Sequence, residues 1–393
     1  MNAEIRTTAA PQSHFPLLPV SLFVLAWIGL PLSVIGVFFH PFLPGGWLSI
    51  SGALLLVAIP LRALVNGFTR EAYPNASTRL FIMRPFWYAM LALPLIAIGM
   101  LTGAALGFPF GDSAQFARWS TAITIPGLSL LSIMGWYHSR KLTLKVIDVS
   151  ISRLPEAFEG LKIVQISDLH VGPHTSKPFL AKIQQTVLNQ QPDLIVITGD
   201  QVDDFAHDIE HFNAAFKDLE APCGVYAVIG NHDIYANWIP VKAGLESSGI
   251  QVLLNESKSI EKDGQRIWIA GTGDPAANKN NPLQAPAAPD ISLTFKDISP
   301  NEPVIALAHN PALWSELNQR GVDLTLSGHT HYGQFAIPFL NWSLASPFLE
   351  HAMGLYKKGT STLYINPGTG FWGVPFRFGT PAEVSVIRLS SRK

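Results

Sequence analysis

Residues 162–170 read KIVQISDLH, a short run of β-branched and apolar residues followed at once by an aspartate and, two residues on, a histidine. Such a run predicts a buried β-strand, because strands with both faces covered show near-continuous apolar sequence. Four further apolar runs also end in polar turns. They cover residues 193–198, 224–229, 304–308 and 324–327. This repeated change from apolar strand to polar turn decides the fold.

Helical patterns lie between several of these predicted strands. They cover residues 177–189, 209–219 and 240–248. Strands that alternate with helices indicate a layered α/β architecture. A hairpin is predicted over residues 260–269 around Asp263-Gly264, so part of the sheet is expected to be antiparallel.

Charge divides the chain into two parts. Residues 1–145 carry nine Lys or Arg and three Asp or Glu, whereas residues 146–393 carry 18 and 25. We therefore predict an apolar membrane region over 1–145 and an acidic globular domain over 146–393. The acidic domain has no run of Lys and Arg, so no nucleic-acid partner is expected. The single cysteine, Cys223, rules out an intrachain disulfide.

Four apolar stretches near the N-terminus approach the length that crosses a bilayer, about 20 residues. They are Pro16 to Phe39, Trp47 to Val65, Phe86 to Phe108 and Trp119 to Tyr137. The sequence therefore predicts a transmembrane region of four helices. A buried helical domain of a soluble protein is disfavoured, because these runs leave almost no polar face.

Basic residues favour one orientation of these helices, because cytoplasmic loops carry an excess of Lys and Arg. They are Arg70, Arg79 and Arg84 after the second stretch, and Arg140, Lys141 and Lys145 after the fourth. Both termini are thus predicted to be cytoplasmic. The chain would be a multi-pass protein of the cell (inner) membrane, with its globular domain on the cytoplasmic face.

Seven side chains of metal-binding type follow the predicted strands. They are Asp168, His170, Asp200, Asn231, His309, His329 and His331. In open α/β sheets binding sites assemble at this edge, so the fragments are expected to converge. An extended backbone at Asp168 and His170 would point both side chains to one side while Leu169 faces the core.

The ligand types indicate both the metal and the reaction. Asp200 has two carboxylate oxygens and is expected to bridge two divalent ions. Imidazole and carboxylate ligands without thiolate favour Mn, Fe or Zn, with Mg as a further option. Two such ions activate water for displacement at phosphorus, so a phosphoric ester hydrolase is predicted. His232 is surplus to the ligand set and is the predicted catalytic acid, with Asp233 as the candidate to orient it.

Five short blocks carry these residues. They are SDLHVG at 167–172, GDQVD at 199–203, GNHD at 230–233, HNP at 309–311 and GHTHYGQ at 328–334. Together they resemble the calcineurin-like metallophosphoesterase family. Residues 154–160 and 366–377, which flank the blocks, resemble its bacterial membrane-linked branch. Tyr332 departs from that branch, which often has glycine at this position, and this puts the substrate's shape in doubt.

The resemblance implies a two-sheet sandwich flanked by helices and a specific distribution of ligands. One metal would be held by Asp168, His170, Asp200 and His331, and a second by Asp200, Asn231, His309 and His329. His232 would be the acid.

The sequence leaves the substrate open. The run 335–349 is rich in aromatic and aliphatic residues and suits either contact with a bilayer beside a lipid substrate or packing inside the protein. Arg377 is a candidate for holding a second phosphate or for a structural ion pair.

The predicted function is a membrane-anchored phosphohydrolase that cleaves a phosphodiester, phosphomonoester or pyrophosphate bond. A lipid or a lipid-linked nucleotide is one candidate substrate. Two alternatives are an anchored hydrolase of soluble nucleotides or phosphodiesters, and a non-catalytic sensor with the same fold.

Overall fold

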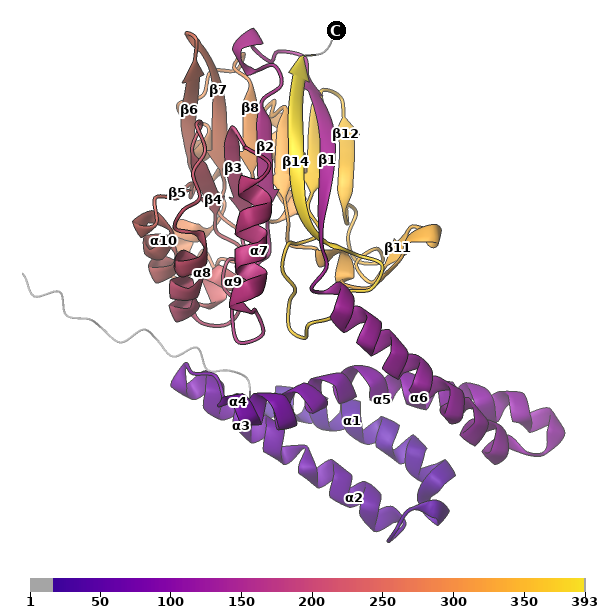
Figure 1. Cartoon of the computed structure of the whole chain (residues 1–393). Helices are drawn as coiled ribbons and strands as arrows, with labels where there is room; N and C mark the ends of the chain where they lie inside the picture. The colour runs from indigo at the N-terminus through magenta and orange to yellow at the C-terminus, as the bar shows by residue number, and fades with distance from the viewer. Residues whose placement is uncertain (1–16, 392–393) are drawn as a thin grey trace, which may run out of the picture. The chain divides into compact units, whose positions relative to one another are not determined.

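The computed structural model describes residues 17–391, and Pro16, where the first predicted membrane stretch begins, lies outside them. The described residues form two compact units, which divide between Leu130 and Leu131. The first contains helices alone, and the second contains two sheets with helices (Figure 1). The boundary predicted from charge, after residue 145, stays a prediction.

The first unit is helical. Its elements are α1 (Leu17–Phe39), α2 (Trp47–Leu56), α3 (Ala58–Arg70), α4 (Ala76–Thr78), α5 (Arg84–Gly107) and most of α6 (Ser113–His138), with short helical turns at His40–Phe42, Arg79–Met83 and Phe108–Phe110. Large apolar side chains such as Leu22, Leu55 and Phe81 are exposed on it. Helices that are apolar all round are typical of a membrane environment.

The prediction of four membrane-spanning helices is one too many. Among the described residues, three segments are long and apolar enough to cross a membrane: Leu18–Phe42, Trp47–Arg70 and Ala76–Phe110. The fourth predicted stretch is helical within α6, but polar residues such as Thr121 and Ser129 dilute it. With three spans, the basic residues at 70–84 and those at 140–145 would lie on opposite faces of the membrane. The positive-inside rule alone therefore no longer orients the chain.

The second unit is a sandwich of two six-stranded sheets. The first sheet has the order β1 (Leu142–Ile151), β14 (Ala382–Ser391), β2 (Lys162–Ile166), β3 (Leu194–Thr198), β4 (Val225–Val228), β5 (Gln251–Val252). The second has the order β12 (Gly354–Lys358), β13 (Ser361–Ile365), β9 (Leu324–Ser327), β8 (Val304–Leu307), β7 (Gln265–Gly271), β6 (Glu256–Lys262). A separate small hairpin pairs β10 (Ala336–Ile337) with β11 (Trp342–Ser343).

Apolar side chains join the two sheets and cover their outer faces. Along β2, Ile163 packs between the sheets while Val164 and Ile166 pack toward helices, because successive side chains on a strand point to opposite faces. The covering helices are α7 (Lys177–Leu188), α8 (Ile209–Phe216) and α10 (Trp238–Ser247) on the first sheet, and α11 (Ile291–Thr294) and α12 (Trp314–Gln319) on the second. The predicted two-sheet sandwich flanked by helices is confirmed.

Parallel pairing sets the position of the site. Strands β2, β3 and β4 are parallel neighbours in the first sheet, and β7, β8 and β9 are parallel neighbours in the second. Their carboxyl ends therefore share one edge of each sheet. The predicted hairpin is also present, as the antiparallel pair β6 and β7.

Candidate metal centre

The seven candidate ligands all follow the carboxyl ends of parallel strands, in turns or at the first residue of a short helix. Asp168 and His170 follow β2, Asp200 follows β3, Asn231 follows β4, His309 follows β8, and His329 and His331 follow β9. Hydrogen bonds join the two edges: the His329 N–H donates to Asp168 Oδ1 at 2.9 Å, and His309 Nδ1 lies 2.7 Å from the Thr198 carbonyl oxygen. The fold thus brings all seven side chains to one place.

The first group of donor atoms comes from Asp168, His170 and His331, which are all buried. The Nε2 atoms of the two histidines lie 2.9 Å apart, and His331 Nε2 lies 3.4 Å from Asp168 Oδ1. Asp200 Oδ2 lies 3.5 Å from His170 Nε2. Side chains from three turns therefore converge closely enough to share one cation.

The second group comes from Asn231, His309 and His329. Asn231 Oδ1 lies 3.0 Å from His309 Nε2 and 2.8 Å from His329 Nδ1. His309 Nε2 lies 3.3 Å from Asp200 Oδ2. The same carboxylate oxygen of Asp200 thus approaches a histidine of each group, which is where a bridging ligand would lie.

These contacts are stable only with positive charge between the donor atoms. A carbonyl oxygen only accepts, so His309 Nδ1 must donate to Thr198, and Nε2 of the neutral ring carries a lone pair. That lone pair faces the oxygens of Asn231 and Asp200, and such acceptors repel unless a proton or a metal ion lies between them. A donor set of imidazoles, carboxylates and one amide oxygen fits divalent transition metals.

Burial sets the charge of the ligands. It lowers the pKa of His170, lowers that of His331 well below the usual value, and lowers the pKa of His329 to about 4. Burial opposes ionisation of Asp200 as well, but attraction to His309 and His170 outweighs it and holds the pKa of Asp200 below its usual value. Burial likewise opposes a charge on His309, but attraction to Asp200 raises the pKa of His309 well above its usual value. His309 therefore holds a proton that a bound cation would have to displace, while His170, His329 and His331 are already neutral.

Comparison with known proteins decides the family. The family profile of the calcineurin-like phosphoesterases matches residues 161–333. The uncharacterized metallophosphoesterase YkuE of Bacillus subtilis is 31% identical over 268 residues, which are 65% of this chain and 90% of that protein. This chain belongs to the calcineurin-like phosphoesterase family.

Two other relatives match a smaller share of their own length. An uncharacterized metallophosphoesterase of Helicobacter pylori is 35% identical over 232 residues, 58% of this chain and 60% of that protein. A transmembrane protein with metallophosphoesterase domain from Bos taurus is 32% identical over 294 residues, 71% of this chain and 64% of that protein. The chain therefore spans less than two thirds of the length of these two relatives.

Several candidate ligands of this phosphoesterase domain lie in the left-handed backbone region. The φ angles are 52° at Asp168, 43° at His170, 53° at Asp200, 71° at His329 and 48° at His331. The extended backbone expected at Asp168 and His170 is therefore wrong, although Leu169 is buried in the core as expected. Left-handed backbone at non-glycine residues costs about 1–3 kcal/mol each and persists at functional sites where surrounding contacts hold it.

Two glycines let the turns approach one another closely. A Cβ on Gly230 would lie 2.2 Å from Asp200 Oδ1, and a Cβ on Gly328 would lie 2.2 Å from Asp168 Oδ2. Real Cβ atoms do not come this close to oxygen, so any side chain at either position would displace a candidate ligand.

Ser167 holds Asp168 in place: its hydroxyl donates to Asp168 Oδ2 at 2.5 Å. We expect Ser167→Ala to weaken Mn²⁺ binding by about 10–100-fold, because contacts that orient a ligand typically have effects of this size. Calorimetric titration of Mn²⁺ into the metal-free full chain measures this affinity.

Ser327→Ala is the matched control. Ser327 is also buried beside the site, but its hydroxyl has no hydrogen-bond partner among the described residues. Its removal should leave Mn²⁺ affinity near that of the unchanged chain. Equal losses in the two variants would contradict a specific role for Ser167.

His232 lies beside both groups of ligands. Its Nδ1 is 3.0 Å from the carbonyl oxygen of Asp203, so Nδ1 must donate and Nε2 is left for other contacts. Its backbone N–H donates to Asp200 Oδ1 at 2.8 Å. His232 also lies close enough to His170 and Asp200 to complete a third donor group. His170 and Asp200 already belong to the two proposed ligand groups. His232 is therefore not needed as a ligand in either of them.

Asp233 does not orient His232, contrary to the suggestion from sequence. Its buried carboxylate accepts hydrogen bonds from the backbone N–H groups of Gln201, Val202 and Gly230. These bonds join the turn after β3 to the turn after β4. Asp233 therefore stabilises the framework that carries the ligands.

The acidic residue beside His232 is Asp203, which sequence reasoning did not assign. Its Oδ1 lies 3.8 Å from His232 Nδ1 and 3.3 Å from His170 Nδ1. Burial raises the pKa of Asp203 to about 7. The available signal was its place in the block GDQVD, three residues after Asp200.

Arg377 is fully buried, and no ion pair joins it to another described residue. Its Nε donates to the carbonyl oxygen of Gly370 at 2.8 Å and its Nη1 to that of Pro367 at 2.9 Å. Its Nη2 lies 3.4 Å from His331 Nδ1. Arg377 therefore holds the loop behind a candidate ligand.

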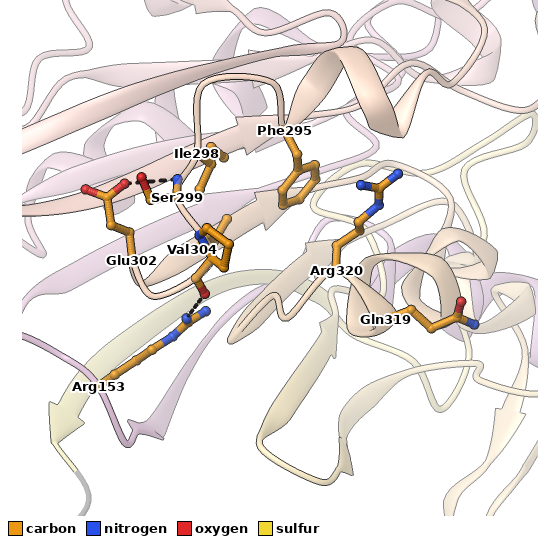
Figure 2. Close-up of a pocket in the computed structure, with 9 residues that line it drawn as sticks. Arg153, Phe295, Ile298, Ser299, Glu302, Val304, Gln319 and Arg320 are labelled. Carbon is orange, nitrogen blue, oxygen red and sulfur yellow. Dashed lines mark hydrogen bonds between the residues drawn. The ribbon is translucent and has the colours of Figure 1, made fainter.

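A pocket of about 250 Å³ lies at the amino end of β8, away from the carboxyl end that carries the candidate site. Figure 2 shows Arg153, which donates to the backbone carbonyl oxygen of Pro300, and Glu302, which accepts from the Ser299 N–H. Arg153 also pairs with Asp323 at 2.8 Å. Glu302 pairs with Arg266, so Arg153 and Glu302 are both held by residues outside the pocket, and we assign the pocket to the framework.

Proposed function

We propose that this chain is a membrane-anchored, dinuclear-metal phosphohydrolase. The observation that carries the proposal is the position of Asp200, whose Oδ2 lies 3.5 Å from His170 Nε2 in one ligand group and 3.3 Å from His309 Nε2 in the other. A single carboxylate shared by two groups of histidines is the arrangement that two-metal phosphoesterases need.

The ligands divide between two sites. One divalent ion would be held by Asp168, His170, Asp200 and His331, and the other by Asp200, Asn231, His309 and His329. Mn²⁺ suits this set, and Fe, Zn and Mg are further options. Bound divalent ions supply the charge that activates a water molecule and neutralises the phosphoryl oxygens.

His232 is the proposed general acid. Its Nδ1–H is held by the Asp203 carbonyl oxygen, which directs Nε2 toward the departing oxygen of a substrate. His232 thus delivers a proton to the leaving alkoxide, a contribution typically worth about 10²–10⁴-fold in rate.

Hydrolysis by the full chain in detergent tests this function. With Mn²⁺ added, we expect turnover of bis-p-nitrophenyl phosphate, loss of turnover with EDTA, and recovery when Mn²⁺ is restored. Binding of Mn²⁺ without hydrolysis of any phosphodiester, phosphomonoester or pyrophosphate would support the alternative of a non-catalytic sensor instead.

A lipid substrate is favoured by the segment that follows the last ligands. Phe335 stacks on Phe378 at 5.4 Å and Ala336 is buried, so part of the segment packs within the domain. Phe339 and Phe348 are 85% and 84% exposed. Figure 1 shows the β11 hairpin projecting from the two sheets. Exposed aromatic residues on a projecting loop suit insertion into the surface of a bilayer.

The double substitution Phe339→Ser and Phe348→Ser tests this use of the loop. We expect turnover of a phospholipid in mixed micelles to fall about thirtyfold, since the two rings removed from the interface together lose on the order of 2 kcal/mol. Turnover of soluble bis-p-nitrophenyl phosphate should stay unchanged. Unchanged lipid turnover would favour soluble nucleotides or phosphodiesters as substrates.

We place the domain on the cytoplasmic face, because Arg140, Lys141 and Lys145 lie where the chain enters it. Protease digestion of inverted and right-side-out membrane vesicles tests this. The domain should be cut in inverted vesicles and protected in right-side-out ones. The reverse result would follow if the cluster of Arg70, Arg79 and Arg84 sets the orientation.

A further inference from the structure

Two exposed aromatic side chains flank the candidate acid. The ring of Tyr235 lies 5.7 Å from the His232 ring at 65°, and the ring of Trp372 lies 5.9 Å from it at 66°. Tyr235 is 66% exposed and Trp372 is 54% exposed. Large aromatic side chains are usually covered by a core, so two of them beside one histidine at an open site need an explanation.

Tyr235 is positioned by the element that carries the site. It is the last residue of α9 (Asn231–Tyr235), the short helix that begins with a candidate ligand and includes the candidate acid. Residues three apart on a helix are neighbours on its surface, so Tyr235 lies on the same side as His232. The ring therefore moves with the acid.

Trp372 is positioned by the loop that carries the histidine pair of the last block. Its backbone N–H donates to Gln334 Oε1 at 2.7 Å, and Gln334 Nε2 donates to the Trp372 carbonyl oxygen at 2.9 Å. The Gln334 N–H in turn donates to the His331 carbonyl oxygen at 2.9 Å. These bonds hold an exposed ring at a fixed distance from the metal ligands, although exposure of the ring adds nothing to stability.

We propose that Tyr235 and Trp372 form a subsite for the leaving group and that this subsite selects a planar ring. The inference rests on the proposed role of His232. If Nε2 of His232 delivers a proton to the departing oxygen, the group on that oxygen must lie within about one ring's width of His232. Both aromatic rings lie within that range, with centroids 5.7 and 5.9 Å from the His232 ring, and can line such a space. A planar group gains stacking contacts that a saturated group of similar size does not.

Two diesters with leaving groups of similar acidity test the subsite. They are phenyl methyl phosphate and hexafluoroisopropyl methyl phosphate, assayed with the Mn²⁺-loaded full chain in detergent. We expect Tyr235→Ala and Trp372→Ala each to lower kcat/KM for the phenyl ester by about five- to tenfold, mainly through KM. The hexafluoroisopropyl ester should change less than about twofold. Tyr235→Phe and Trp372→Phe should retain most of the preference.

Leu293→Ala is the control, because Leu293 is an exposed apolar residue on α11. It should leave both esters unaffected. Equal losses for the two esters in Tyr235→Ala and Trp372→Ala, or no loss at all, would overturn the subsite.

A binding measurement separates this inference from the proposed function. The Mn²⁺-loaded full chain should bind phenylphosphonate more tightly than methylphosphonate, and Trp372→Ala should remove the difference. If the unchanged chain hydrolyses neither ester, the proposed function fails while this comparison still decides the subsite. Equal affinity for the two phosphonates would overturn the subsite even if both esters are cleaved.

Discussion

Replacing Asp200 with Asn is expected to abolish phosphodiester hydrolysis and to reduce the bound divalent metal from two ions per chain to one or none. Asp200 Oδ2 lies between His170 and His309, and its Oδ1 accepts from the His232 N–H. The amide keeps the size of the side chain but removes its charge. Loss of the shared carboxylate should cost several kcal/mol, which is on the order of a thousandfold in rate.

Asp148→Asn provides the control for this change. Asp148 lies exposed on β1 and forms an ion pair with Arg388 on β14. Surface ion pairs contribute little to stability. Metal content by inductively coupled plasma mass spectrometry and turnover of bis-p-nitrophenyl phosphate measure both variants. An Asp200→Asn chain with two bound ions and full turnover would rule out Asp200 as the bridging ligand.

Replacing His232 with Ala is expected to slow turnover by about 10²–10⁴-fold for esters with a poor leaving group, while metal uptake stays near that of the unchanged chain. Metal uptake should persist because the contact of His232 with Asp200 is made by its backbone and not by its side chain. The backbone N–H that donates to Asp200 survives the substitution, so the bridging carboxylate keeps its position. Only the side chain that faces the leaving oxygen is lost.

The leaving group provides an internal control for His232. A p-nitrophenyl ester departs without full protonation, so its hydrolysis should be slowed less than that of an alkyl ester. Turnover of both esters, with Mn²⁺ affinity by calorimetry, gives the comparison. Equal rates for the variant and the unchanged chain would remove His232 from this role, and a parallel loss of metal would make it a ligand instead.

The sequence predicts the layered α/β fold and the convergence of the candidate ligands because both depend on local pattern, whereas the two-sheet sandwich follows from the family resemblance. Each buried strand is an apolar run, and parallel neighbours must place their carboxyl ends on one edge. The pairing of strands that are distant in the sequence cannot be predicted in this way. β1 pairs with β14 between Leu142 and Ala382, and nothing in either segment identifies its partner, because register is set by contacts distant in sequence.

Details of the site also depend on contacts that spacing does not show. Asp233 adjoins His232 in sequence, yet its carboxylate turns to backbone N–H groups, and Asp203 lies beside His232 instead. The left-handed backbone at Asp168 and His170 is likewise imposed by the surrounding turns. Spacing left Arg377 open to a phosphate contact or an ion pair, and it did not show the hydrogen bonds that Arg377 donates to carbonyl oxygens of its own loop.

The most direct test of the central claim is an anomalous difference map from a crystal of the full chain grown with saturating Mn²⁺. We expect two peaks about 3.5–4 Å apart, the spacing of two-metal hydrolytic sites, one on each side of the Asp200 carboxylate. A single peak, or none, at saturating Mn²⁺ would contradict the dinuclear centre on which the proposed function depends.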